Sequence, residues 1–503
     1  ACPSYTGDWD GTKFCRDGWP SGEADALRMA QQLMLTTAEF HAASTNPLRG
    51  DVRAAAPPSP SLGRPYKAII VLFLGGGADS YNILVPRDGC ANTSAGVELY
   101  AEYEEVRGML AIKREDLRRL DLPPGHGQPC DAFGLHPELH ELQRRFNNHS
   151  DAAWFANIGA LVEPMTKTEW KKGTKKRPRS LFAHNAQQNA AANLHAQSLS
   201  AKGVLGRMVD ALKEQPSPWA TGAYSIMGTQ KFLEGHGASA QVSLSRSNGI
   251  KKFQWGWQMA DHVRNLSAAP SSAAFADTYG AAVGAALDTT EGLGAILDAS
   301  QVNESYPEED LAEQFRMVAK VIHSRKERGV ERDAFYVKIG GFDTHSDEGG
   351  ILTDKMQKID AALAPFIREM EGAGTWNDVA IVSASDFGRT LTSNGRGSDH
   401  AWAGHHFVMG GDVKGGQMFG KYPPDLAETD ANPLNIGRGR LIPTLGWEAI
   451  WQPLAQWFGV ADDQMDFVLP NRNNFAPELL VEEGALFRPR PPAPPAAPPP
   501  PAP

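Results

Sequence analysis

Apolar and polar positions follow two alternating patterns along most of the chain. Apolar or mixed runs, typical of buried parallel strands, occupy Lys67–Leu74, Ala153–Ile158, Phe335–Ile339 and Val379–Ser383. Between them, apolar residues spaced by three and four, or runs rich in helix-forming residues, predict helices. We expect these helices at Glu98–Arg107, Ala183–Gln197, Val204–Glu214, Glu308–Arg328 and Lys355–Met370.

The last two predicted strands enclose a predicted helix and so form a βαβ crossover. Such a crossover winds right-handedly and places both strand ends at one edge of the sheet. Strand-like and helix-like runs keep alternating from Tyr66 to about Phe475 without a low-complexity break. We therefore expect an α/β fold with a central, mostly parallel sheet flanked by helices.

Three regions of different composition follow one another along the chain. Residues 1–64 hold a cysteine-containing loop, a helical stretch near Glu23–Phe40 and a Pro/Ala-rich linker. Residues 65–487 form the predicted α/β domain. Residues 488–503 are nearly all Pro and Ala, a composition that favours an extended polyproline II tail without a packed core.

Length and charge narrow the possible functions. With 503 residues, 41% of them hydrophobic and 21% charged, the chain can bury a large core. Its net charge is −10, and the basic residues cluster only near 171–179, so we expect no nucleic-acid partner. The longest apolar stretch, Ala68–Leu74, is far shorter than the roughly 20 residues of a membrane span.

Four cysteines bear on the compartment in which the protein works. Their spacing avoids the CxxC pattern of metal sites. We favour disulfides Cys2–Cys15 and Cys90–Cys130 in a secreted or extracytoplasmic protein, although the chain itself contains no targeting signal. The alternative is four reduced thiols in a cytosolic enzyme.

Acidic residues and a histidine follow three of the predicted strands. Asp79, Asp343, His345 and Asp386 stand where the chain leaves the carboxyl end of a strand, the edge at which open α/β sheets bind ligands. Carboxylate oxygen and imidazole nitrogen together are the mix that zinc, manganese or iron accept. We therefore expect a divalent metal as the cofactor, among Zn, Mn, Ca and Mg. The alternatives are a helix cap for Asp79 and an Asx-turn with a surface histidine for the other loop.

Further residues complete the predicted site. His400 and one of the adjacent pair His405 and His406, which we assign as His405, extend the ligand set, because neighbours in an extended segment face opposite ways. Arg389 offers a two-pronged hydrogen-bond donor for an anionic oxygen. Ser180 precedes a predicted helix, and we expect it to be either a nucleophile or the helix N-cap.

Several motifs in one order resemble a known family. They are FLGGGADSYNILVP, FGLHP, RSLFAHNAQ, GVLGRMVDAL, VKIGGFDTH, SDFGRT, SDHAWAGHHFVMGG and WFGV followed by LPNRNNF. Residues of about 66–475 resemble the domain of unknown function 1501 family, mostly bacterial exported proteins placed in the alkaline phosphatase and sulfatase superfamily.

The resemblance implies a sheet-edge site of one or two divalent metals at which Ser, Thr or a derived residue attacks phosphate or sulfate esters. It implies metal ligands at Asp79, Asp343, His345, Asp386 and His400 and a nucleophile at Ser180. Phe387 stands where the superfamily commonly has a histidine, which weighs against a second metal. No C-x-P-x-R signature surrounds Ser180, which disfavours a formylglycine sulfatase.

Together these features predict an exported, metal-dependent hydrolase of phosphate or sulfate esters on a small molecule or glycan. Its nucleophile would be Ser180 or a metal-bound water. One alternative is a catalytically silent surface protein of the same fold that binds a glycan or cell-wall polymer, which the twelve Trp residues and the Pro-rich tail suit. A phosphomutase is a third possibility.

Overall fold

The computed structural model describes residues 61–236, 241–247, 249–250, 256–268 and 274–490, with six further positions between 27 and 35. The cysteines of the predicted Cys2–Cys15 pair, most of the predicted helix Glu23–Phe40, the linker up to residue 60 and the tail beyond 490 lie outside the described residues.

The chain divides into two compact units, one of Ala1–Pro58 with Gly249–Ala299 and one of Ser59–Asn248 with Ser300–Pro503. The first contains helices α8 (Gly256–Ser267) and α9 (Ala274–Ala299), which pack against each other. The single domain predicted at 65–487 did not separate Gly249–Ala299 from the rest of the α/β fold.

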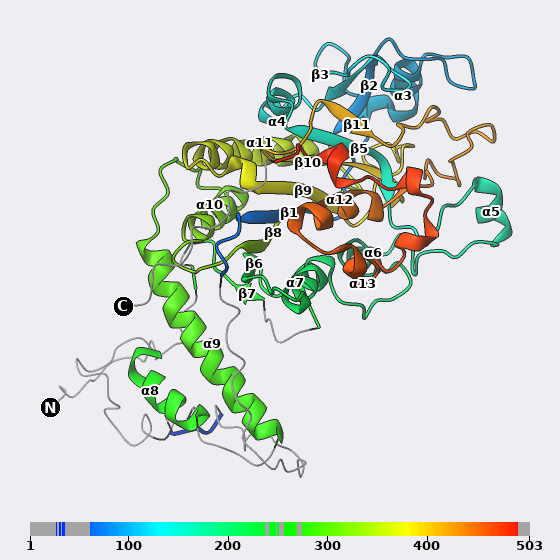
Figure 1. Ribbon diagram of the computed structural model, residues 1–503. Coiled ribbons are helices and arrows are strands. Elements are labelled where there is room, and N and C mark those ends of the chain that lie inside the picture. Colours follow the sequence, from blue (N-terminus) through cyan, green and yellow to red (C-terminus); the bar gives the residue numbers. More distant parts are fainter. Residues whose placement is uncertain are drawn as a thin grey trace, which may run out of the picture. The chain divides into compact units, whose positions relative to one another are not determined.

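A nine-stranded sheet lies at the centre of the second unit, among its described residues (Figure 1). Eight strands follow the order β11-β5-β10-β9-β1-β8-β6-β7, and β12 pairs with β5. All run in one direction except β10, which is antiparallel to both of its neighbours. The predicted mostly parallel sheet is therefore confirmed. The strands are β1 (Lys67–Gly75), β5 (Ala152–Gly159), β6 (Thr221–Ser225), β7 (Val242–Ser243), β8 (Arg332–Gly340), β9 (Val379–Ser385), β10 (Gly404–Met409), β11 (Gln417–Phe419) and β12 (Leu445–Gly446).

The ends of three central strands lie level with one another. Gly75 at the end of β1 pairs with Gly340 at the end of β8, and Leu74 pairs with Ser385 at the end of β9. The crossover from β8 to β9 therefore passes over β1, which lies between them. Because all three strands are parallel, the loops that follow them leave the sheet at the same edge.

Helices cover both faces of the sheet (Figure 1). On one face α6, α7 and α12 pack against Ile69, Val71 and Phe73 of β1. On the other, α10 and α11 pack against each other, and Met356 and Ile359 of α11 approach Leu74. The helices of this unit are α3 (Leu99–Arg107), α4 (His140–Arg144), α5 (Lys167–Lys172), α6 (His184–Asn193), α7 (Val204–Glu214), α10 (Asp310–His323), α11 (Glu348–Gly372), α12 (Glu448–Phe458), α13 (Met465–Val468) and α14 (Glu483–Leu486).

Each predicted strand and helix in this unit is present, with ends shifted by up to seven residues. None of the described helices is both long enough and apolar enough to cross a bilayer.

A small antiparallel sheet carries the predicted disulfide. Its strands are β2 (Leu84–Asp88), β3 (Arg118–Asp121) and β4 (Ala132–Leu135), in the order β2-β4-β3. Cys90 follows β2 and Cys130 precedes β4, and the two are joined, which confirms the predicted pair. The bond closes a loop with a sequence separation of 40 residues.

Replacing Cys90 and Cys130 by Ser should lower the stability of this unit. Loop-closure entropy for a loop of this length predicts a loss of roughly 4 kcal/mol, because the unfolded chain is no longer constrained. Denaturant unfolding of the oxidised protein checks this, with Cys2→Ser/Cys15→Ser as the matched control. Coincident transitions for wild type and the Cys90/Cys130 variant would contradict the prediction.

Candidate metal centre

Three loops approach closely at the carboxyl edge of the sheet. Gly76 and Gly77, directly after β1, have φ of 120° and 81°. A Cβ on Gly76 would lie 2.5 Å from the backbone nitrogen of Asp343, and one on Gly77 would lie 2.3 Å from the Phe387 ring. Glycine is therefore required for this turn and for the contact of the β1 loop with the loops after β8 and β9.

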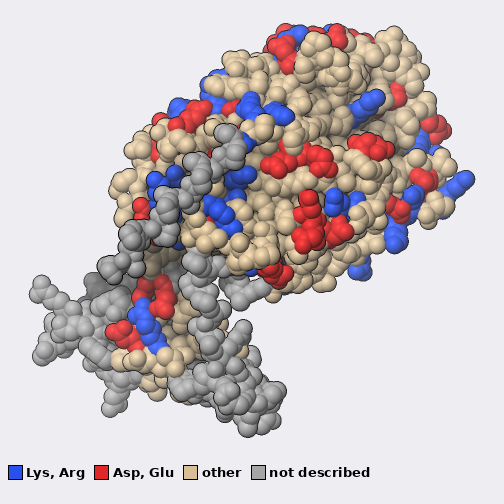
Figure 2. All heavy atoms as spheres, viewed as in Figure 1, with Lys and Arg blue, Asp and Glu red and all other residues tan. Residues whose placement is uncertain are grey.

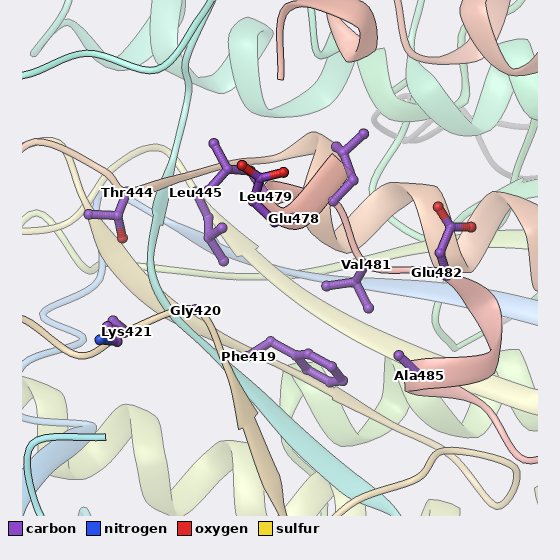
Figure 3. Close-up of a pocket in the computed structure, with 11 residues that line it drawn as sticks. Phe419, Gly420, Lys421, Thr444, Leu445, Glu478, Leu479, Val481, Glu482 and Ala485 are labelled. Atoms are coloured by element: carbon purple, nitrogen blue, oxygen red, sulfur yellow. The ribbon is translucent and has the colours of Figure 1, made fainter. Parts of the chain in front are cut away.

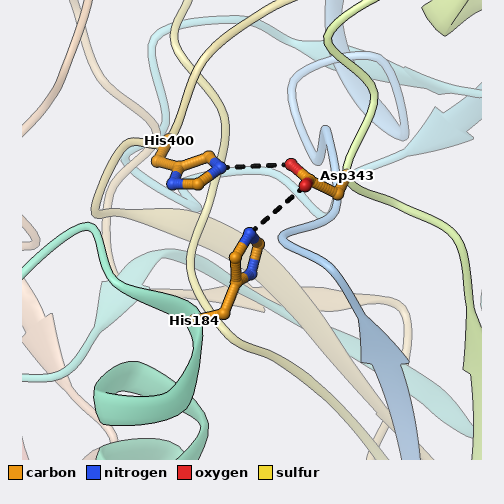
Figure 4. Close-up of side chains that lie close together, drawn as sticks. All are labelled: His184, Asp343 and His400. Atoms are coloured by element: carbon orange, nitrogen blue, oxygen red, sulfur yellow. Dashed lines mark hydrogen bonds and ion pairs between the residues drawn. The ribbon is translucent and has the colours of Figure 1, made fainter.

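Three imidazoles converge on the carboxylate of Asp343, which lies in the loop after β8. The Nε2 atoms of His345 and His400 lie 3.0 and 3.1 Å from Oδ1. The Nε2 atom of His184, the first residue of α6, lies 3.4 Å from Oδ2. Figure 4 shows His184 and His400 pointing at the carboxylate from two sides. The ligand atoms of His184, Asp343 and His400 all lie within 4.8 Å of one another.

The second nitrogen of each ring is held by an oxygen that can only accept a hydrogen bond. The Nδ1 atom of His184 lies 2.8 Å from Oδ2 of Asp386, that of His400 lies 2.8 Å from the carbonyl oxygen of Phe182, and that of His345 lies 3.1 Å from Oδ1 of Asp399. Each Nδ1 must therefore donate, which leaves the Nε2 of a neutral ring with a lone pair.

These lone pairs face a carboxylate, which also only accepts. Such an arrangement is stable only if extra protons or a shared cation lie between the rings and the carboxylate. Histidine ligands of metals characteristically donate their other N–H to a carboxylate or a backbone carbonyl. The donor set and its supporting contacts therefore fit a divalent cation held by His184, Asp343 and His400, with His345 beside it.

Arg389 and Asp386 hold this arrangement in place. Arg389 is fully buried and donates to Oδ1 of Asp343 at 3.0 Å and to Oγ of Ser398 at 3.0 Å. Asp386 accepts from the Gly76 backbone at 3.1 Å and from Gln188 at 2.8 Å as well as from His184. Arg389, predicted to hold an anionic oxygen, holds an oxygen of the Asp343 carboxylate, which is the placement of a positioning residue.

The carboxylate of Asp343 stays charged at neutral pH. Partial burial raises its pKa, but the hydrogen bond from Arg389 and the positive charge that His400, His184 and His345 carry when protonated outweigh that effect. The net result is a pKa below the ordinary value, as a metal-binding carboxylate requires.

Phe387 forms an apolar wall beside the cluster. Its ring centroid lies 4.9 Å from that of His184 and 4.7 Å from that of His400. An aromatic ring supplies no metal ligand, so this side of the cluster suits a single-ion site.

Asp79 lies behind the cluster rather than in it. Its Oδ2 is paired with Arg107, and both side chains are buried. Arg107 also donates to the carbonyls of Thr390 and Leu391, at 2.9 and 3.0 Å. Arg107 thus ties α3 to the loop after β1, through Asp79, and to the segment after β9.

A second buried carboxyl group, Glu348 at the start of α11, interacts with Asp79. Burial and then the charge of Asp79 raise the pKa of Glu348 to about 7. Burial likewise raises the pKa of Asp79, against the opposing charges of Arg107 and Arg389.

His405 also lies apart from the histidine cluster. His405 is buried between Tyr81 and Tyr422, with ring centroids 4.7 Å away in each case. Burial lowers the pKa of His405 to about 3, so the ring stays neutral. Ser180 is exposed, and the alternative that it caps α6 is wrong because Ala183 occupies the N-cap position.

His184 was not predicted as a site residue, although it lies inside the quoted motif RSLFAHNAQ. Its position at the first turn of a helix that packs near β9 brings it to the edge. The sequence could have identified His184 only through information that places this motif against the Asp386 loop.

An apolar groove lies elsewhere in the second unit. A groove of about 620 Å³ runs between the ends of β11 and β12 and residues 478–485 (Figure 3). Phe419, Leu445, Leu479 and Val481 give it an apolar lining, and no histidine contributes to it. The groove and the histidine cluster share no residue.

Comparison with known proteins places the chain in a family. A profile of the family described as protein of unknown function (DUF1501) matches residues 66–438. The chain belongs to this DUF1501 family. The resemblance noted from the sequence motifs is confirmed. A comparison with curated proteins finds no match.

Several solved structures are similar to this DUF1501 protein at low identity. The lipoteichoic acid synthase LtaP from Listeria monocytogenes has 8% identity and a TM-score of 0.28, over 82% of this chain and 76% of that one. The PsFucS1 sulfatase from Pseudoalteromonas sp. has 11% identity and a TM-score of 0.32, over 85% and 74%. The phosphonate monoester hydrolase of Agrobacterium radiobacter has 10% identity and a TM-score of 0.30, over 81% and 77%. Likeness at this level adds no weight to any activity.

Arg107→Gln should destabilise the protein by about 3–5 kcal/mol, because it leaves the buried Asp79 carboxylate without its partner. The matched control is Arg114→Gln, whose partly exposed pair with Glu98 spans 2.8 Å and should contribute about 1 kcal/mol or less. Denaturant unfolding of both variants measures the difference. Equal losses in the two variants would contradict the assignment of Asp79 as a buried anchor.

Glu348→Gln should change how stability depends on pH. In the wild type the folded state keeps the Glu348 proton up to pH about 7, whereas the unfolded chain releases it near its ordinary pKa of 4.5. The stabilisation is therefore complete below pH about 4.5 and is lost as pH rises through about 7, at about 1.4 kcal/mol per pH unit.

Urea unfolding between pH 5 and 8, in a chelator so that metal binding adds no pH dependence, measures this effect. Wild type should lose stability relative to Glu348→Gln as the pH rises. Parallel pH profiles would contradict the raised pKa.

Proposed function

We propose that this protein is a metal-dependent hydrolase of phosphate or sulfate esters that works outside the cytoplasm. His184, Asp343 and His400 would hold one divalent cation, with His345 as an adjacent fourth group. The observation that carries the proposal is the convergence of three Nε2 atoms on one carboxylate, each ring being held at Nδ1 by an acceptor.

A divalent cation at this position would polarise a non-bridging oxygen of a bound ester and stabilise the charge that develops there. The site is accessible to a substrate, because the side chains of Asp343 and His345 are 44% and 46% exposed. Two nitrogen donors and one oxygen donor match Zn or Mn better than the all-oxygen sets of Ca or Mg.

The chain's own residues divide the remaining tasks. Asp386 and Asp399 hold the His184 and His345 rings, and Arg389 holds the Asp343 carboxylate. Ser180, exposed and four residues before His184, is one candidate nucleophile, and water is the other. The Cys90–Cys130 disulfide supports an oxidising, extracytoplasmic location.

Phe387 supports a single cation rather than the two that the superfamily resemblance allows. Its ring occupies the space against His184 and His400, and Asp386 is already engaged by three donors. We therefore assign Asp386 to the support of His184 and not to a second metal.

The purified protein should bind about one transition-metal ion per chain and hydrolyse an aryl phosphate or an aryl sulfate. His184→Gln, Asp343→Asn and His400→Gln should each lower metal content and turnover by about two orders of magnitude, because each removes a direct ligand. Elemental analysis and a chromogenic ester assay measure both quantities. His149→Gln, at an exposed histidine outside the cluster, is the control.

Metal at one ion per chain without turnover on either ester class would favour the silent glycan-binding or polymer-binding alternative. Neither metal nor turnover across Zn, Mn, Mg and Ca would overturn the proposal.

A further inference from the structure

One segment beside the metal centre has a charge opposite to that of the whole chain. Residues 160–183, called the basic segment below, contain five Lys, two Arg and two Glu, a net charge of +5 in a chain of net charge −10. The segment joins β5 to α6 and ends directly before His184.

The basic segment is held in a defined conformation. Thr166 and Glu169 form a reciprocal capping box at the start of α5, which ends at Gly173 in the left-handed region. The ring of Trp170 packs against Trp402 at 5.4 Å, and the guanidinium of Arg177 stacks over Trp170 at 4.0 Å. These contacts give the basic segment an ordered surface.

The basic segment also contacts the metal centre directly. The carbonyl of Phe182 accepts from Nδ1 of His400, and Trp402 lies two residues beyond His400. Arg440 lies 4.2 Å above the Phe182 ring and donates to the carbonyl of His400 at 2.8 Å. A ligand that extends from the metal centre toward Phe182 would therefore reach the end of the basic segment and meet Arg440 above the Phe182 ring.

The acidic residues of the basic segment are occupied within it. Glu169 belongs to the capping box, and Glu163 accepts from Lys175 and from the backbone of Lys176, both at 2.9 Å. The side chains of Lys172, Lys176 and Arg179 are exposed, and none has a carboxylate within 4.0 Å among the residues that the structure describes. Figure 2 shows lysine and arginine side chains at the edge where Figure 1 draws α5.

We propose that the basic segment binds additional anionic groups of the substrate, so that the substrate is a polyanion bearing several phosphate or sulfate groups. This inference rests on the proposed function, which places the reacting ester at the metal centre. Single exposed ion pairs contribute little, but several acting on one chain add up and steer an anion toward the site. Binding of this kind weakens as salt screens the charges.

The test measures binding without turnover, in a chelator. Inorganic polyphosphate and dextran sulfate are titrated against the full-length protein by tryptophan fluorescence at about 50 mM and 200 mM salt, a range over which screening becomes strong. Lys172→Gln/Lys176→Gln/Arg179→Gln should weaken binding by about tenfold at the lower salt, the combined effect of three exposed ion pairs. The two probes distinguish phosphate from sulfate as the preferred group.

The matched control is Lys113→Gln/Lys326→Gln/Lys421→Gln, which removes three exposed positive charges outside the basic segment. Unchanged affinity in the control, with weaker binding in the segment variant, supports the inference. Absence of binding to both probes in wild type, or equal weakening in the two variants, overturns it. Because no catalysis is involved, failure of the ester assay would count against the proposed function alone.

Discussion

The parallel hydrogen-bonded register of β8, β1 and β9 decides where this protein can place its chemistry. The three strands end level at Gly340, Gly75 and Ser385, so the loops that follow begin at the same edge. Two glycines after β1 then let the backbones approach more closely than a Cβ would permit. Everything in the histidine cluster depends on this convergence, because its residues come from three separated parts of the sequence: His184, the loop with Asp343 and His345, and His400.

The cluster is organised by the hydrogen-bonding capacity of its atoms. Imidazole carries one donor and one acceptor when neutral, and an oxygen acceptor at Nδ1 determines which nitrogen keeps the lone pair. Because this happens in three rings around Asp343, the lone pairs are directed at one point. A cation bound there would separate these lone pairs from the carboxylate. A fully buried arginine, Arg389, and a carboxylate, Asp386, hold two of the residues that would bind it.

Carboxyl groups with similar positions in the sequence differ in how deeply they are buried. Asp79 and Asp343 both follow Gly-containing strand ends, yet Asp343 is 44% exposed while Asp79 is closed off behind Arg107. The first is available to a ligand, whereas the second stabilises the packing of α3. Glu348 is a further buried acid beside Asp79, and the low polarity of its surroundings favours its protonated form. The exposed carboxyl group of Asp343 can therefore contact a ligand, whereas the buried groups of Asp79 and Glu348 contribute to packing.

The basic segment adds positive charge on one side of the exposed histidine cluster. It joins the sheet to the helix that carries His184, and its indole and arginine contacts hold it in a defined conformation. In a protein with an excess of acidic residues, such a segment creates a local positive field that attracts anions.

The sequence alone was sufficient for the α/β class, the mostly parallel sheet, the Cys90–Cys130 pair and the approach of Asp343, His345 and His400. Apolar runs and helical periodicity are local properties, and the acidic loops follow directly from strand ends. Only the tertiary structure decided that His184 joins Asp343, that Asp79 pairs with Arg107, that Arg389 is a support and that His405 lies among tyrosines. Those outcomes depend on burial and on partners distant in the chain, and neither is encoded in the spacing of a single motif.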